Sequence, residues 1–105
     1  DQPDLEKEAC RYLRTPVWKG IWHAGELETA LMLHVAPELV DMGAATCEFP
    51  QVPSDYGLRP IPWREFLQSG AFGDSRAADR EHGEVLFALW VRRLGEVIAN
   101  VIHGG

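Results

Sequence analysis

One imidazole and two carboxylates stand where an apolar helix is expected to begin. We expect that helix over residues 24–36, and His23 and Glu26 are three residues apart at its start. Side chains at this spacing share one side of a helix, so the pair can bind a divalent metal or do acid–base work beside one. The alternative is structural: a histidine near the helix cap and a glutamate that complements the helix dipole.

The neighbouring side chains add to this candidate site. Glu28 lies about 200° around the helix from Glu26, at 100° per residue, so the two carboxylates should not share a ligand. A buried carboxylate satisfied by backbone N–H groups or an arginine is the alternative for Glu28. Trp18 and Trp22 come just before His23, and we expect at least one indole to form a pocket wall unless both are core or interface residues. Trp63, in a proline-rich loop, can cap a pocket or pack on a neighbour.

The elements that must position these residues are mostly helical. Apolar periodicity, proline and glycine divide the sequence into a few segments. They are a helix over 3–14, a strand over 17–22, a helix over 24–36, a short helix over 38–42, an irregular connection over 43–73 and a long helix over 75–102 capped by Asp74 or Ser75. A single strand makes no sheet, and the helix over 24–36 is apolar on most sides. We therefore expect another chain, or an N-terminal part of the domain, to cover it.

Length, net charge, hydropathy and cysteine spacing limit the classes of protein to which the chain can belong. The chain has 105 residues, enough for one domain or part of one, and its net charge of −6 argues against a nucleic-acid partner. No apolar run is long enough to cross a membrane, and no signal peptide is visible, so we expect a cytoplasmic protein. Cys10 and Cys47 have no metal-binding spacing. Two free thiols are expected in a reducing compartment, with a disulfide as the alternative.

Three ordered segments resemble the C-terminal signature of the creatininase (creatinine amidohydrolase) family. Residues 23–29 and the following Leu-Met-Leu-His resemble the family's HAG-x-x-ETS-x-ML pattern. Residues 36–42 resemble (R/Y)P-(E/D)-LV-D, and residues 73–78 resemble GDPR-x-A. Ala30 stands where the family usually has Ser, and Ser75 where it usually has Pro. Neither departure affects a metal ligand.

The resemblance implies an α/β fold, with residues 1–105 as the C-terminal portion of one three-layer α/β/α domain. It implies a site with two divalent metals (zinc, manganese or iron), in which metal-activated water attacks an amide or cyclic amide. By motif position, His23 would be catalytic, Glu26 a metal ligand and Glu28 a supporting residue behind the ligands. Trp18 and Trp22 would contact the substrate.

The resemblance also implies a partner. The family's other ligands are a Glu-x-His pair, an Asp and a GHGGN-type His from the N-terminal half, and this sequence contains neither a Glu-x-His nor an NGHGG motif. We therefore expect the protein to be inactive alone and to need a companion polypeptide, in a hexamer-like assembly acting on a small-molecule or peptide amide. The alternative is a non-catalytic structural or interaction subunit derived from the same family.

Overall fold

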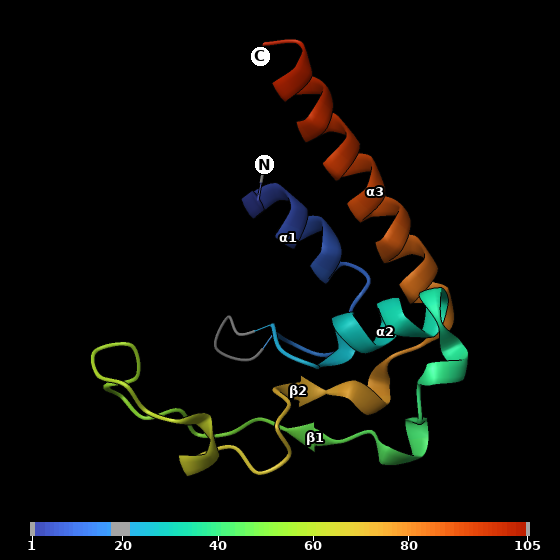
Figure 1. Ribbon diagram of the computed structural model, residues 1–105. Helices are drawn as coiled ribbons and strands as arrows, with labels where there is room; N and C mark the ends of the chain where they lie inside the picture. The colour runs from blue at the N-terminus through green and yellow to red at the C-terminus, as the bar shows by residue number, and fades with distance from the viewer. Residues whose placement is uncertain (1, 18–21, 105) are drawn as a thin grey trace.

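Helices make up most of the regular secondary structure of the described residues. The computed structural model describes residues 2–17 and 22–104 (Figure 1). Within them lie the helices α1 (Gln2–Cys10), α2 (Glu26–Val35) and α3 (Arg80–Ile102) and the short strands β1 (Cys47–Glu48) and β2 (Gly73–Asp74). Single 3-10 turns at residues 37–39, 42–44, 63–65 and 75–77 connect them.

The core forms where α2 crosses the first half of α3. Its buried side chains come from all three helices and the turn before α3: Leu5, Ala9, Leu27, Ala30, Ala78, Leu86 and Leu89. The two helices approach closely at Gly83, where a Cβ atom would lie 1.9 Å from the carbonyl oxygen of Ala30. Only glycine fits there, so this position fixes the distance between α2 and α3.

Polar contacts tie α1 and the turn after it to the other helices. Arg92 of α3 pairs with Glu8 of α1 at 3.2 Å. The Arg14 guanidinium pairs with Asp79 just before α3 and donates to the carbonyl of Ala77 at 3.3 Å. Arg14 therefore lies against the start of α3.

The strands β1 and β2 pair in antiparallel fashion, with Cys47 opposite Asp74 and Glu48 opposite Gly73. This pair is the only sheet within the described residues. The connection between the strands runs away from the helices as an extended loop (Figure 1). The expected irregular connection over 43–73 is therefore present, with a strand near each of its ends. The described residues thus combine helices with one small two-stranded sheet.

Several predicted boundaries need correction. The first helix ends at Cys10 rather than at residue 14, because residues 11–13 continue it only as i→i−3 turns. The long helix begins at Arg80, since the Asp79 side chain accepts from the backbone N–H of His82 at 2.7 Å. Asp74 caps the preceding 3-10 turn instead, and Ser75 lies within that turn. Of the predicted strand over 17–22, residues 18–21 lie outside the described residues, and Trp22 is not in a strand.

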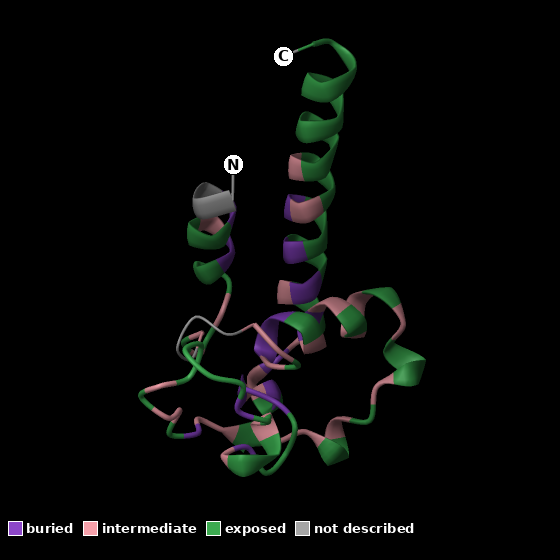
Figure 2. Cartoon of the chain, turned by 60° about the vertical axis from the view of Figure 1, so that its left-hand side comes forward, coloured by how far each residue is buried: buried purple, intermediate pink, exposed green. Residues whose placement is uncertain are grey.

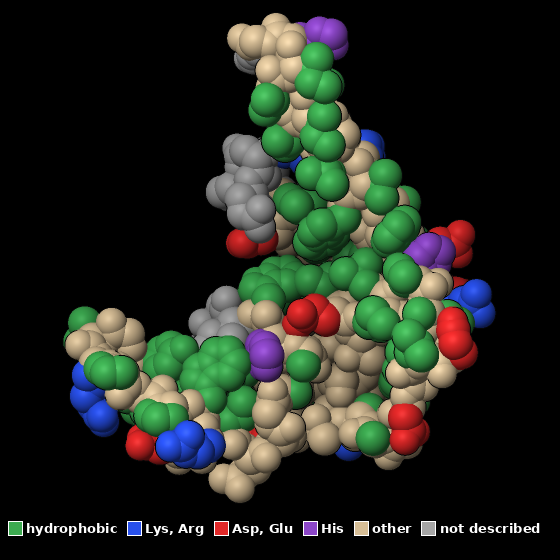
Figure 3. Space-filling model, viewed as in Figure 1, with side chains coloured by type: hydrophobic (Ala, Val, Ile, Leu, Met, Phe, Trp, Pro, Cys, Tyr) green, Lys and Arg blue, Asp and Glu red, His purple; other side chains and the backbone are tan. Residues whose placement is uncertain are grey.

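The second half of α3 leaves the core. Burial along this helix stops after its first turns (Figure 2), and the remainder carries a line of hydrophobic side chains on its surface (Figure 3). Leu94 is 60% exposed and Val101 is 77% exposed. Val91, Leu94, Ile98 and Val101 follow one another at intervals of three and four residues, so they form one apolar stripe. No helix in the described part of the protein is long and apolar enough to cross a membrane.

Candidate functional site

His23 lies in a short non-helical segment immediately before α2. Ala24 has a φ of 54°, the left-handed region that non-glycine residues rarely adopt, and Gly25 is the N-cap of α2. A Cβ atom at Gly25 would lie 2.5 Å from the carbonyl oxygen of Phe72, so this position needs glycine. The backbone N–H of Phe72 donates to the carbonyl oxygen of His23 at 2.9 Å. The segment before β2 therefore fixes the backbone of His23.

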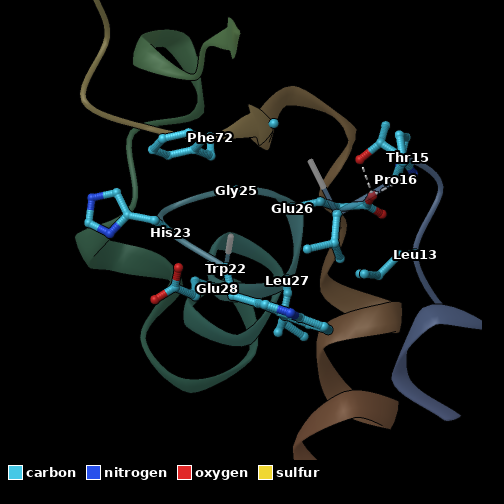
Figure 4. A pocket seen from close by; sticks show the side chains of 12 residues that line it. Leu13, Thr15, Pro16, Trp22, His23, Gly25, Glu26, Leu27, Glu28 and Phe72 are labelled. Atoms are coloured by element: carbon cyan, nitrogen blue, oxygen red, sulfur yellow. Dashed lines mark hydrogen bonds between the residues drawn. The ribbon is translucent and has the colours of Figure 1, made fainter. Parts of the chain in front are cut away.

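Glu28 lies with His23 at the start of α2. Both residues line a small cavity of about 20 Å³, and Figure 4 shows their side chains on the same side of the segment. The Glu28 carboxylate accepts from the backbone N–H of Ala24, which holds it over the N-terminal end of the helix. It remains exposed, so it is not the buried carboxylate that was the alternative for this position.

Glu26 points the other way, toward the turn after α1 (Figure 4). It is only 5% exposed. Its Oε1 accepts from Thr15 N at 2.8 Å, Thr15 Oγ1 at 2.7 Å and Arg14 N at 2.9 Å, and its Oε2 accepts from Arg14 N at 2.7 Å. Three donors thus share one buried carboxylate, which joins the residue 14–15 turn to α2.

The expected pairing of His23 with Glu26 on one side of a helix is not what the structure has. The helix begins at Glu26, and the left-handed backbone at Ala24 turns the chain just before it. Helical i,i+3 geometry therefore does not apply between the two residues. All three residues line the small cavity, but the side chains of His23 and Glu28 lie on the same side of the segment, whereas Glu26 points away from them (Figure 4). The roles predicted for His23, Glu26 and Glu28 in catalysis and metal binding stay predictions.

Whether the predicted metal site can form depends on how many metal-ligating side chains lie close together. A complete site needs at least three protein ligands, and nowhere in residues 2–17 and 22–104 do three His, Cys, Asp or Glu side chains gather in that way. Of the roughly four lone-pair sites on a carboxylate, hydrogen bonds fill most on Glu26. The described residues therefore do not by themselves fit a dinuclear metal centre.

Of the two tryptophans predicted to contact the substrate, the structure describes only Trp22. Trp22 is half-buried, borders the small cavity beside His23, and also forms a wall of a larger groove of about 290 Å³ with Leu31 and Trp90. Trp18 lies outside the described residues. Cys10 and Cys47 are both exposed and free.

An aromatic cluster lies beside His23, and little in the sequence indicates it. The Trp63 ring lies 4.8 Å from the His23 ring and 4.9 Å from that of Phe72, between centroids. Phe66 contacts both Phe72 and Tyr56. Trp63 was expected to cap a pocket or pack on a neighbour, but its neighbour was unknown, because 40 residues separate it from His23. The recurrence of aromatic residues among the prolines of the loop was the only available signal.

Glu48 anchors the loop that carries this cluster. Its carboxylate accepts from the backbone N–H groups of Gln68 at 2.8 Å and Ser69 at 2.7 Å. These hydrogen bonds favour the ionised form and hold the pKa of Glu48 below its ordinary value. The loop is thus fixed at β1 and again at the Phe72–His23 backbone contact.

Comparison with known proteins agrees with this arrangement of motifs. Residues 4–98 match the family model described as "Creatininase: Creatinine amidohydrolase", so the chain belongs to the creatininase family. A creatinine amidohydrolase from Pseudomonas putida is 30% identical over 78 residues. That alignment covers 74% of this chain and 30% of the relative, so the chain spans under a third of the relative's length. No solved structure matches the chain significantly.

Proposed function

We propose that this chain is the C-terminal part of a metal-dependent amidohydrolase, which cleaves a C–N bond in an amide or cyclic amide and is inactive without the rest of the domain. The observation that carries the proposal is the pairing of His23 and Glu28 at the start of α2 in a member of the creatininase family. An exposed carboxylate and a half-buried imidazole beside a cavity are suited to proton transfer.

The protein's own residues would act as follows. His23 would move a proton between the attacking water and the leaving nitrogen, since an imidazole can both accept and donate a proton. Glu28 would hold the segment that carries His23 through its bond to the Ala24 N–H. The Trp22 indole would form an apolar wall that excludes bulk water. Trp18 is proposed as a second substrate contact on the motif alone.

The metals of the complete enzyme are proposed to be two divalent ions, zinc, manganese or iron, which suit imidazole and carboxylate ligands. Because the described residues do not form a metal centre, most ligands would come from the N-terminal half. The motif assigns Glu26 to the metal. In this structure Glu26 stabilises the turn after α1, so metal binding would require it to give up donors at Arg14 or Thr15.

The exposed stripe on α3 supports a companion polypeptide. A row of apolar side chains on a helix that extends past its own core is typical of a surface that another element covers. We propose that the companion carries the N-terminal half, completes a three-layer α/β/α domain with residues 1–105, and enters a hexamer-like assembly. The proposed compartment is the cytoplasm, where the free Cys10 and Cys47 thiols would stay reduced.

A second candidate is a non-catalytic structural or interaction subunit. The observation that favours it is the absence of a metal-ligand cluster from the described residues, together with the exposed stripe on α3. Both candidates require a partner, but only the amidohydrolase requires His23.

The deciding experiment is native mass spectrometry of the protein as isolated, with metal analysis of the same sample. The amidohydrolase predicts a second polypeptide and about two metals per pair of chains, with hydrolysis of creatinine or of other small or peptide amides. In that complex, His23→Gln should abolish hydrolysis and leave assembly intact. As a matched control, His103→Gln, at the exposed end of α3, should change neither. A metal-free assembly without hydrolysis would leave the interaction subunit as the conclusion.

A further inference from the structure

The Trp63 ring contacts the imidazole of His23. The two rings meet edge to face, with centroids 4.8 Å apart and planes inclined by 68°. Among residues 2–17 and 22–104, no hydrogen bond reaches either ring nitrogen of His23. The backbone bond from Phe72 fixes where the side chain begins but leaves its two torsions free. The aromatic contact restricts them, because edge-to-face pairs have a preferred geometry.

Trp63 is itself held in place. Its indole N–H donates to the Tyr56 hydroxyl at 2.7 Å, and its ring also meets that of Phe72 at 71°. Phe72 supplies the backbone N–H that binds His23, so one segment of the loop fixes both the backbone and the ring of this residue. A rigid aromatic partner reduces the orientations open to a proton-transferring group, which is how positioning residues raise reaction rates.

We propose that Trp63 is a positioning residue for His23, and that the loop between β1 and β2 serves to bring its indole against the imidazole. This inference rests on the proposed function, because it assigns Trp63 a part in the same reaction. It adds to that function a residue 40 positions from His23 and outside the segments that resemble the family's motifs.

The first test is an NMR spectrum of the imidazole protons of the four histidines in the 105-residue chain, with the His23 signals identified from their loss in His23→Gln. In Trp63→Leu, we expect these signals to move toward the values of an unstructured histidine, because the ring current of the indole is lost. Trp63→Phe should retain most of the displacement. Tyr56→Phe, which keeps every ring but removes the hydroxyl bound to the indole, should give a smaller change in the same direction.

Phe66→Leu is the matched control in the same loop, because Phe66 contacts Tyr56 and Phe72 but is not paired with His23. It should leave the His23 signals in place. If Trp63→Leu leaves them unchanged in a folded protein, or if Phe66→Leu moves them as far, Trp63 does not orient His23 and the proposal is overturned.

The second test is kinetic and uses the complex with the companion polypeptide. Loss of one aromatic contact should lower kcat about 2- to 10-fold in Trp63→Leu with little change in KM, and Trp63→Phe should restore most of it. An unchanged kcat despite displaced His23 signals would overturn the positioning role. A wild-type complex without amidohydrolase activity would overturn the proposed function instead. The NMR spectrum would still report whether the two rings are in contact.

Discussion

Two glutamates close together at the start of α2 have different surroundings. Glu26 and Glu28 are two positions apart, yet one is buried against the turn after α1 and the other is exposed beside His23. Their spacing of about 200° predicted that they could not share a ligand, and they lie on different sides of the segment as expected (Figure 4). Which of them would accompany His23 depended on the backbone turn at Ala24.

Replacing Glu26 by Gln should destabilise the fold. The amide keeps the side chain's volume but turns an NH2 group toward N–H and O–H donors, so buried hydrogen bonds to a charged acceptor are lost. We expect the free energy of unfolding to fall by about 2–3 kcal/mol in Glu26→Gln. In the exposed control Glu28→Gln it should fall by less than about 1 kcal/mol. Urea denaturation measures both, and equal losses in the two variants would contradict the structural role of Glu26.

Two glycines in α3 should respond in opposite directions to alanine. At Gly83 the added Cβ atom meets the Ala30 carbonyl at 1.9 Å, so α2 and α3 must separate. We expect a loss of at least about 2 kcal/mol in Gly83→Ala. Gly95 has open space around its Cα, so Gly95→Ala should stabilise by about 0.5–1 kcal/mol through helix propensity alone. Thermal unfolding of the two variants separates these effects, and a tolerated Gly83→Ala would rule out the close helix contact.

At the scale of elements, capping decides where the long helix begins. The segment over 74–79 contains three candidate caps, Asp74, Ser75 and Asp79, and sequence alone favoured the first two. Asp79 is the N-cap of α3 instead, because its carboxylate accepts from the helix N-terminus and also pairs with Arg14. The turn after α1 thereby helps to set a helix boundary 65 residues away, which no local pattern can indicate.

Asp79 should also give the fold a defined pH dependence. The His82 backbone N–H, then the nearby His82 and Arg14 side chains, hold the pKa of Asp79 below its ordinary value. A depressed pKa means that this stabilisation is fully present above about pH 4 and is lost as the pH falls through the folded-state value. Asn also caps helices, so Asp79→Asn should lose only the charge-dependent part.

The measurement is the unfolding free energy of wild type and Asp79→Asn between pH 7 and pH 2. Wild type should be more stable by up to about 1 kcal/mol at pH 7, and the difference should vanish at the acid end. Asp79→Ala, which cannot cap, should be less stable than Asp79→Asn across the whole range, by about 1 kcal/mol. A difference between wild type and Asp79→Asn that does not depend on pH would contradict this account.

At the scale of the whole molecule, the apolar stripe on α3 is the main feature that the described residues leave without cover. Two charged substitutions within it, Leu94→Lys with Ile98→Lys, should leave the core intact, because both side chains point away from it. We expect this double variant to prevent binding to the companion polypeptide, since burying unpaired ammonium groups costs several kcal/mol. Size-exclusion chromatography of the mixed polypeptides measures the effect.

The matched control for the stripe is Arg92→Lys with Glu96→Lys on the opposite side of the same helix, which should leave binding intact. Both double variants leave the helical residues between the two substituted positions unchanged. A difference in binding between the variants therefore reflects the stripe alone. If the stripe variant still binds the companion with unchanged affinity, the partner does not use this face of α3.

The sequence by itself determined the helices, the irregular connection and the family, because helical periodicity, proline and glycine act locally and the motifs keep their order along the chain. It also predicted that another chain or an N-terminal part covers the helix over 24–36, and this stays a prediction. Only the tertiary structure decided that Glu28 rather than Glu26 accompanies His23, that Trp63 meets the imidazole, and that Asp79 caps α3. Each depends on contacts between residues far apart in the sequence or on a left-handed backbone at a single alanine, and neither leaves a periodic signal in the sequence.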